Sequence, residues 1–160
     1  SAPERIKKMV SRKDILVING PNLNMLGKRE PGIYGTTTLA DIEAHCQAAA
    51  KAHGLNCRFF QSNNEAAIID AIHQASQDNL AGMVINAGAF THTSIAIRDA
   101  LAILSVPVVE THLSNTYARE EFRHHSYLAG VVTGVINGFG IHSYSLAIDA
   151  VAATLAKESS

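Results

Sequence analysis

The chain has 160 residues, 47% of them hydrophobic, and a formal net charge of -1. This length accommodates one domain with a full hydrophobic core and leaves no room for two. The small net charge predicts no general electrostatic attraction to nucleic acid or to a membrane surface, and no apolar run approaches the roughly 20 residues of a membrane span.

The chain is expected to divide into an N-terminal extension or expression remnant, residues 1–13, and a single domain, residues 14–160. The first segment is basic and lacks the apolar stretch of a signal peptide. Two cysteines, Cys46 and Cys57, are too few for a disulfide framework. We expect both to be buried free thiols in a reducing, cytoplasmic environment.

Stretches typical of strands alternate with stretches typical of helices along the whole domain. Strands are predicted at residues 14–18, 55–61, 83–86, 107–111 and 131–136. Helices are predicted at residues 39–53, 65–77, 93–104 and 141–157, with a short helical turn at 119–124. This alternation predicts an α/β fold, a flavodoxin-like three-layer sandwich around a five-stranded parallel sheet of order 2-1-3-4-5.

Polar side chains follow three of the predicted strands at the point where each strand ends. In a sheet of this order, ligands bind at the carboxyl ends of the strands, near the switch between the first and third strands. The residues that fall at this edge are Asn22, Asn86, His92, Glu110, His112 and Ser114. Their shared position predicts a site for a polar small molecule.

The first loop, residues 19–35, is long and carries Asn22, Arg29 and Tyr34. Loops of this length between packed elements are usually functional, and the glycines of this one give the freedom that a closing lid needs. A nearby guanidinium favours tyrosinate, although bringing a tyrosine from its usual pKa of about 10 down to 7 requires roughly 4 kcal/mol. The alternative is that Tyr34 only anchors the loop.

His112 is the best candidate acid or base, because imidazole titrates near neutral pH. Glu110 lies two residues earlier, so both side chains point to the same side of an extended strand. A carboxylate in that position fixes the tautomer of the ring. The alternative is a structural ion pair at the end of a strand.

Arg119 and Arg123 are four residues apart and are predicted to share one face of a short helical turn. They are candidates for binding an anion or hydroxyl groups, or they pair on the surface with Glu120 and Glu121. No Cys/His cluster has the spacing of a zinc site, and no glycine motif matches a nucleotide-binding loop. We therefore expect neither a metal nor a cofactor.

Four groups of motifs together resemble type II 3-dehydroquinate dehydratase, and the resemblance covers about residues 14–157. They are residues 19–24 with 29–31 and 34–35, residues 86–88 with 91–94, residues 110–115, and residues 119–127. The resemblance implies a hydro-lyase that dehydrates 3-dehydroquinate to 3-dehydroshikimate. It places the reaction in the shikimate pathway of aromatic amino acid biosynthesis or in the quinate pathway.

The resemblance also implies a role for each catalytic residue. Tyr34, as tyrosinate next to Arg29, would take the proton beside the ketone. Asn22 would hold a water that hydrogen-bonds the enolate oxygen, and such preorganised donors contribute several kcal/mol in a closed site. His112, oriented by Glu110, would protonate the departing hydroxyl.

By the same resemblance, substrate binding falls on Asn86, His92, Asp99, Leu113, Ser114, Arg119 and Arg123. Asn86 and the amides of residues 113 and 114 would bind the carboxylate, His92 and Arg123 the ring hydroxyls, and Arg119 would lie over the site with the lid. Asp99 would reach the site of a neighbouring subunit, which implies trimers assembled into a dodecamer.

Two other functions compete with this interpretation. A Schiff-base dehydratase needs a buried lysine at a strand end, and Lys28, in an exposed-looking loop, is the only lysine near the predicted site. A non-catalytic flavodoxin-like domain that binds a nucleotide or a partner would leave the grouping of Tyr34, Asn22 and His112 unexplained.

Overall fold

The computed structural model describes residues 12–28 and 30–159, and of Tyr34 it describes the backbone alone. Five strands form one parallel sheet in the order β2-β1-β3-β4-β5. The strands are β1 Asp14–Asn19, β2 Asn56–Gln61, β3 Gly82–Asn86, β4 Val108–His112 and β5 Gly134–Asn137. The predicted strand order and the flavodoxin-like α/β fold are confirmed.

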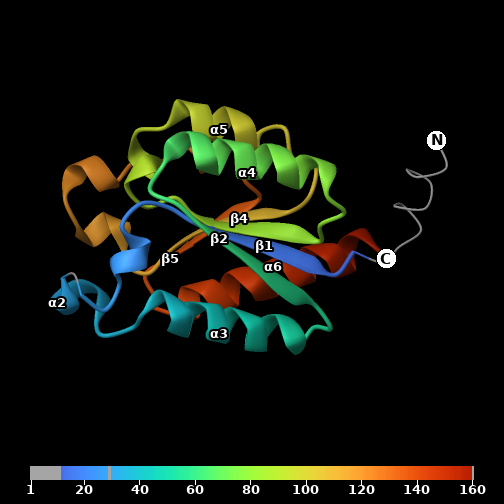
Figure 1. The fold of residues 1–160 in the computed structure, drawn as a ribbon, viewed down its shortest axis with the longest axis horizontal. Helices are drawn as coiled ribbons and strands as arrows, with labels where there is room; N and C mark the ends of the chain where they lie inside the picture. The colour runs from blue at the N-terminus through green and yellow to red at the C-terminus, as the bar shows by residue number, and fades with distance from the viewer. Residues whose placement is uncertain (1–11, 29, 160) are drawn as a thin grey trace.

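Helices cover both faces of the sheet and complete a three-layer sandwich (Figure 1). One face carries α3 (Leu39–Lys51) and α6 (His142–Glu158), and the other carries α4 (Glu65–Gln77) and α5 (Ile95–Leu101). A one-turn helix, α2 (Pro31–Tyr34), lies within the first loop. Among the described residues, none of the helices has the length and hydropathy of a membrane-spanning segment.

The core consists of two apolar layers, one on each face of the sheet. In β1, Ile15 and Val17 pack toward α3 and α6, whereas Leu16 and Ile18 pack toward α4 and α5. Burial on both faces explains why β1 reads as a continuous apolar run rather than an alternating one. The sheet edge that holds the polar residues is thereby fixed from both sides.

Local chemistry sets the ends of the elements. Thr38 and Asp41 form a reciprocal capping box at the start of α3, as Thr38 at a predicted helix start suggests. The predicted helix 93–104 is shorter, because Ser94 caps α5 and residues 88–92 form a separate 3₁₀ turn. Cys46 and Cys57 are buried free thiols, as predicted, and burial raises the pKa of Cys57 to about 12.

Candidate active site

The carboxyl ends of β1, β3 and β4 border a cleft that opens to solvent. Eight of the predicted site residues line it: Asn22, Asn86, His92, His112, Leu113, Ser114, Arg119 and Arg123. Glu110 is buried beside His112 and borders an adjoining hollow rather than the cleft itself. The structure therefore brings these nine predicted residues together at one edge of the sheet.

The other three predicted residues are not among the described residues that line the cleft. Arg29 lies outside the described residues, and so does the side chain of Tyr34, whose backbone ends α2. Asp99 is on α5 with a side chain that is 63% exposed, where it accepts a hydrogen bond from Arg98. It does not line the cleft of its own chain, as the sequence analysis anticipated.

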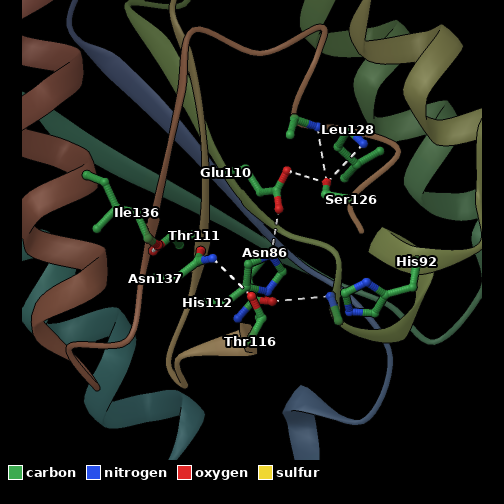
Figure 2. Close-up of polar contacts among 12 residues, drawn as sticks. Asn86, His92, Glu110, Thr111, His112, Thr116, Ser126, Leu128, Ile136 and Asn137 are labelled. Carbon is green, nitrogen blue, oxygen red and sulfur yellow. Dashed lines mark hydrogen bonds and ion pairs between the residues drawn. The ribbon is translucent and has the colours of Figure 1, made fainter. Parts of the chain in front are cut away.

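A buried carboxylate orients the imidazole of His112. Nε2 of His112 lies 2.7 Å from Oε2 of Glu110, and the other carboxylate oxygen accepts a 2.7 Å hydrogen bond from the hydroxyl of Ser126 (Figure 2). Glu110 is 1% exposed and His112 7%. Because Nε2 faces the carboxylate, Nδ1 is the ring nitrogen left to exchange a proton with a ligand in the cleft.

His92 stacks near the ring of His112, with 6.4 Å between ring centroids and 22° between the planes. Burial lowers the pKa of His92, and the nearby His112 and Arg123 act in the same direction, against a hydrogen bond to the carbonyl of His125. The neutral ring donates that 2.8 Å bond through Nδ1. Its Nε2 is then an acceptor, which suits a ligand hydroxyl.

A buried tyrosine, Tyr144, accepts a hydrogen bond from the side chain of Asn86. The hydroxyl of Tyr144 donates to Oδ1 of Asn19 at 2.5 Å and accepts from Nδ2 of Asn86 at 2.9 Å. Oδ1 of Asn86 also accepts from the N–H of Gly88 at 3.2 Å. Burial raises the pKa of Tyr144, so its hydroxyl keeps its proton and the amide of Asn86 has one defined orientation.

The start of the first loop passes close to β3. The N–H of Gly20 donates to the carbonyl of Asn86 at 2.7 Å, and a Cβ on Gly20 would lie 2.4 Å from the carbonyl oxygen of Ala87. Only glycine tolerates so close an approach. Asn22 follows with a left-handed φ of 68°, and its N–H donates to Asn63. This geometry delivers Asn22 to the cleft.

The two arginines reach the cleft by a route that the sequence analysis predicted wrongly. Two successive 3₁₀ turns, Thr116–Ala118 and Glu121–Arg123, occupy this segment, so Arg119 lies at their junction in extended backbone rather than on the helical face of Arg123. Nε of Arg123 donates to Glu120 at 2.6 Å. The predicted pairing with Glu120 and the lining of the cleft therefore coexist.

Three residues that support the site, Asn19, Ser126 and Tyr144, were not predicted from the sequence. Asn19 ends the first strand, which was a usable signal, but its partner Tyr144 lies 125 residues away on α6. Ser126 falls within a recognised motif, yet its contact with Glu110 depends on the path of the loop. Among residues 12–28 and 30–159, no group of three or more His, Cys, Asp or Glu side chains is placed to hold a metal ion.

Comparison with known proteins agrees with this geometry. The family model described as "Dehydroquinase class II" matches residues 13–152. A 3-dehydroquinate dehydratase of Actinobacillus pleuropneumoniae serotype 5b (strain L20) is 57% identical over 145 residues, which is 91% of this chain and 94% of that protein. The catabolic 3-dehydroquinase 1 of Neosartorya fischeri is 57% identical over 140 residues, which is 88% of this chain and 93% of that protein.

A solved structure of a type II dehydroquinase has a similar fold. The type II dehydroquinase of Butyrivibrio crossotus DSM 2876 matches with a TM-score of 0.86 and 46% identity, covering 89% of this chain and 99% of that one. The predicted resemblance is confirmed by sequence and by fold. The chain belongs to the type II dehydroquinase family.

Proposed function

We propose that the cleft dehydrates 3-dehydroquinate in two steps through an enolate, with protein side chains as the only acid and base. The activity itself, the dehydration of 3-dehydroquinate in the shikimate or quinate pathway, follows from the family. The observation that carries the proposed mechanism is the buried Glu110–His112 pair, in which Nε2 of His112 faces the carboxylate while the residue lines the cleft.

The first step removes a proton from the carbon next to the ketone. The proposed base is Tyr34 as tyrosinate, supported by the positive charge of Arg29. The electrons of the C–H bond form a carbon–carbon double bond, and the π electrons of the carbonyl group move to the ketone oxygen, which gives the enolate. A water held by Asn22 hydrogen-bonds this oxygen, and Asn22 is supported in this role by its position at the cleft.

The second step expels the hydroxyl on the neighbouring carbon. The enolate re-forms the ketone, a carbon–carbon double bond forms, and the carbon–oxygen bond breaks. Protonated His112 gives the leaving hydroxyl its proton from Nδ1, so the group departs as water. Glu110 stabilises the positive charge that the ring carries before this transfer. Transfer of the proton from Tyr34 back to His112 through solvent restores the starting state.

Substrate binding is proposed for the remaining residues of the cleft. The amide of Asn86, fixed by Tyr144, and the backbone amides of Leu113 and Ser114 would bind the carboxylate. The acceptor Nε2 of His92 and the guanidinium of Arg123 suit the ring hydroxyls. Arg119 lies 3.8 Å from Glu30 of the first loop and would cover the bound substrate.

Two further parts of the proposal concern the whole assembly and its location. Asp99 is exposed and away from its own cleft, which suits a residue that completes the site of a neighbouring subunit in trimers assembled into a dodecamer. Light scattering on the purified protein measures that mass. The buried free thiols suit a reducing cytoplasm, which cell fractionation would test.

An absorbance assay with 3-dehydroquinate tests the function, because the enone product absorbs near-ultraviolet light and the reactant does not. We expect turnover in buffer that contains a chelator and no added cofactor. Borohydride should not inactivate the enzyme in the presence of substrate, since no lysine among the described residues lines the cleft and Lys28 is exposed. Inactivation would favour a Schiff base, and binding without turnover a non-catalytic domain.

A further inference from the structure

Ser126 contacts the carboxylate that orients the proposed acid, His112. It lies in the segment between the 3₁₀ turn Glu121–Arg123 and β5, beside the carboxylate of Glu110 (Figure 2). Its hydroxyl contacts Oε1 of Glu110 at 2.7 Å, while Oε2 of the same carboxylate contacts His112. The three side chains form one continuous series of hydrogen bonds that ends at the cleft.

The direction of the hydrogen bond from Ser126 is fixed by its other partners. Oγ accepts from the backbone N–H of Leu128 at 3.0 Å and from that of Ala129 at 3.1 Å. A hydroxyl oxygen has two lone pairs, and both are used by these donors. The hydroxyl proton is therefore directed at Oε1 of Glu110, which must accept it.

The backbone donors are themselves held in place. The side chain of Leu128 is fully buried in the apolar layer that faces α4 and α5. The turn that follows Ser126 is thus fixed to the core, and its two N–H groups keep the hydroxyl turned toward the carboxylate. Ser126 is thus held at the carboxylate of Glu110, which is itself 1% exposed.

We infer that Ser126 is a positioning residue for the dehydration, acting on His112 through Glu110. By taking up Oε1, Ser126 leaves Oε2 as the oxygen that faces Nε2 of His112. The carboxylate then holds the ring with Nδ1 toward the cleft and supports its positive charge. This inference rests on the proposed role of His112 as the acid.

Replacement of Ser126 by alanine tests the inference. The Ser126→Ala enzyme should show a kcat about tenfold lower, typical of losing one hydrogen bond to a charged group, with KM changed by less than about twofold. Ser126→Thr restores the hydroxyl and should recover most of kcat. At a pH where the ring is neutral, nitrogen-15 NMR of labelled histidine should show that the share of His112 with its proton on Nε2 falls in the alanine variant and recovers in the threonine variant.

Ser62→Ala is the matched control. Oγ of Ser62 also accepts from the N–H two residues later, at 2.9 Å from Asn64, and forms the same kind of turn away from Glu110. It should lower kcat by less than twofold. If Ser126→Ala does not fold, Ser126→Thr and its isostere Ser126→Val form the comparison, and only the threonine enzyme should keep both kcat and the NMR signal.

Two further variants separate this inference from the proposed function. His112→Ala should lower kcat by a hundredfold or more, and unchanged kcat there would overturn the proposed acid. If His112→Ala is impaired while Ser126→Ala behaves like the Ser62 control, the inference about Ser126 is wrong and the acid stands. In a Glu110→Gln background, Ser126→Ala should add little further loss, and full additivity of the two effects would also overturn the inference.

Discussion

The two sides of the cleft are built in opposite ways. The wall, defined here by Asn86, Glu110 and His112, stands at the ends of β3 and β4, and all three side chains are buried with hydrogen-bond partners. The second half of the first loop, residues 28–35, is exposed at every position whose burial is described, and Ile33 is 47% exposed. The side chains of the wall are thus held in place by the fold, whereas those of this part of the loop are exposed to solvent.

This difference separates the two proposed proton transfers. The proposed acid belongs to the wall, where burial and the Glu110 carboxylate fix its geometry. The proposed base belongs to the first loop, where Glu30 has a left-handed φ of 42° that glutamate seldom adopts. Catalysis would then begin once the substrate and Arg119, near Glu30, draw the loop over the cleft.

The largest expected effect comes from the loop. Tyr34→Phe removes the proposed base but keeps the ring, so kcat should fall about a thousandfold while KM changes by a few-fold at most. Steady-state measurement with the absorbance assay gives both constants. Tyr117→Phe, at an exposed tyrosine that does not line the cleft, is the control and should retain full kcat. A Tyr34→Phe enzyme with substantial kcat would place the base elsewhere.

Substitutions at two glycines, Gly20 and Gly32, should differ in their effect on the free energy of unfolding. Gly20→Ala forces a Cβ to within 2.4 Å of the carbonyl of Ala87 and should cost about 3 kcal/mol of unfolding free energy. Gly32, in the loop, has no atom within 4 Å of an added Cβ, so Gly32→Ala should change stability by less than about 1 kcal/mol. Urea unfolding of both variants measures the difference, and equal losses would contradict it.

The fold was predictable because its signals are local. The apolar run of β1, Thr38 before α3 and the alternation of elements each depend on neighbouring residues, and the sheet order follows from packing rules. Strand ends then place His112 and Asn86 at one edge. Glu110 beside His112 was predictable for the same reason, since side chains two residues apart share one side of a strand.

The supports of the site were not predictable, because they depend on contacts between distant segments. Nothing near Tyr144 in sequence indicates that its hydroxyl lies between Asn19 and Asn86, since α6 must first pack on the sheet. Arg119 was placed on a helical face because its spacing to Arg123 is helical, whereas two short turns interrupt the segment.

A smaller effect is expected from removing one of these supports of the wall. Tyr144→Phe deletes the hydroxyl alone and leaves the amides of Asn19 and Asn86 without their shared partner in the core. It should cost about 2 kcal/mol of unfolding free energy and raise KM roughly fivefold with a smaller change in kcat. Urea unfolding and steady-state kinetics measure the two effects. Unchanged KM would mean that the orientation of Asn86 does not depend on Tyr144.

The smallest expected effect is a pH dependence of stability that comes from His92. This residue lines the cleft, whereas the first loop contains no histidine. Burial lowers the pKa of His92, so below the ordinary value of 6.5 the unfolded chain binds more protons than the folded one. Stability should therefore fall as the pH drops through this value, and His45, whose pKa burial also lowers, contributes with the same sign. The urea midpoint of the His92→Gln variant should change less between pH 7.5 and about 5.5 than the midpoint of the parent chain. If the two midpoints change with pH to the same extent, His92 is not a source of the pH dependence.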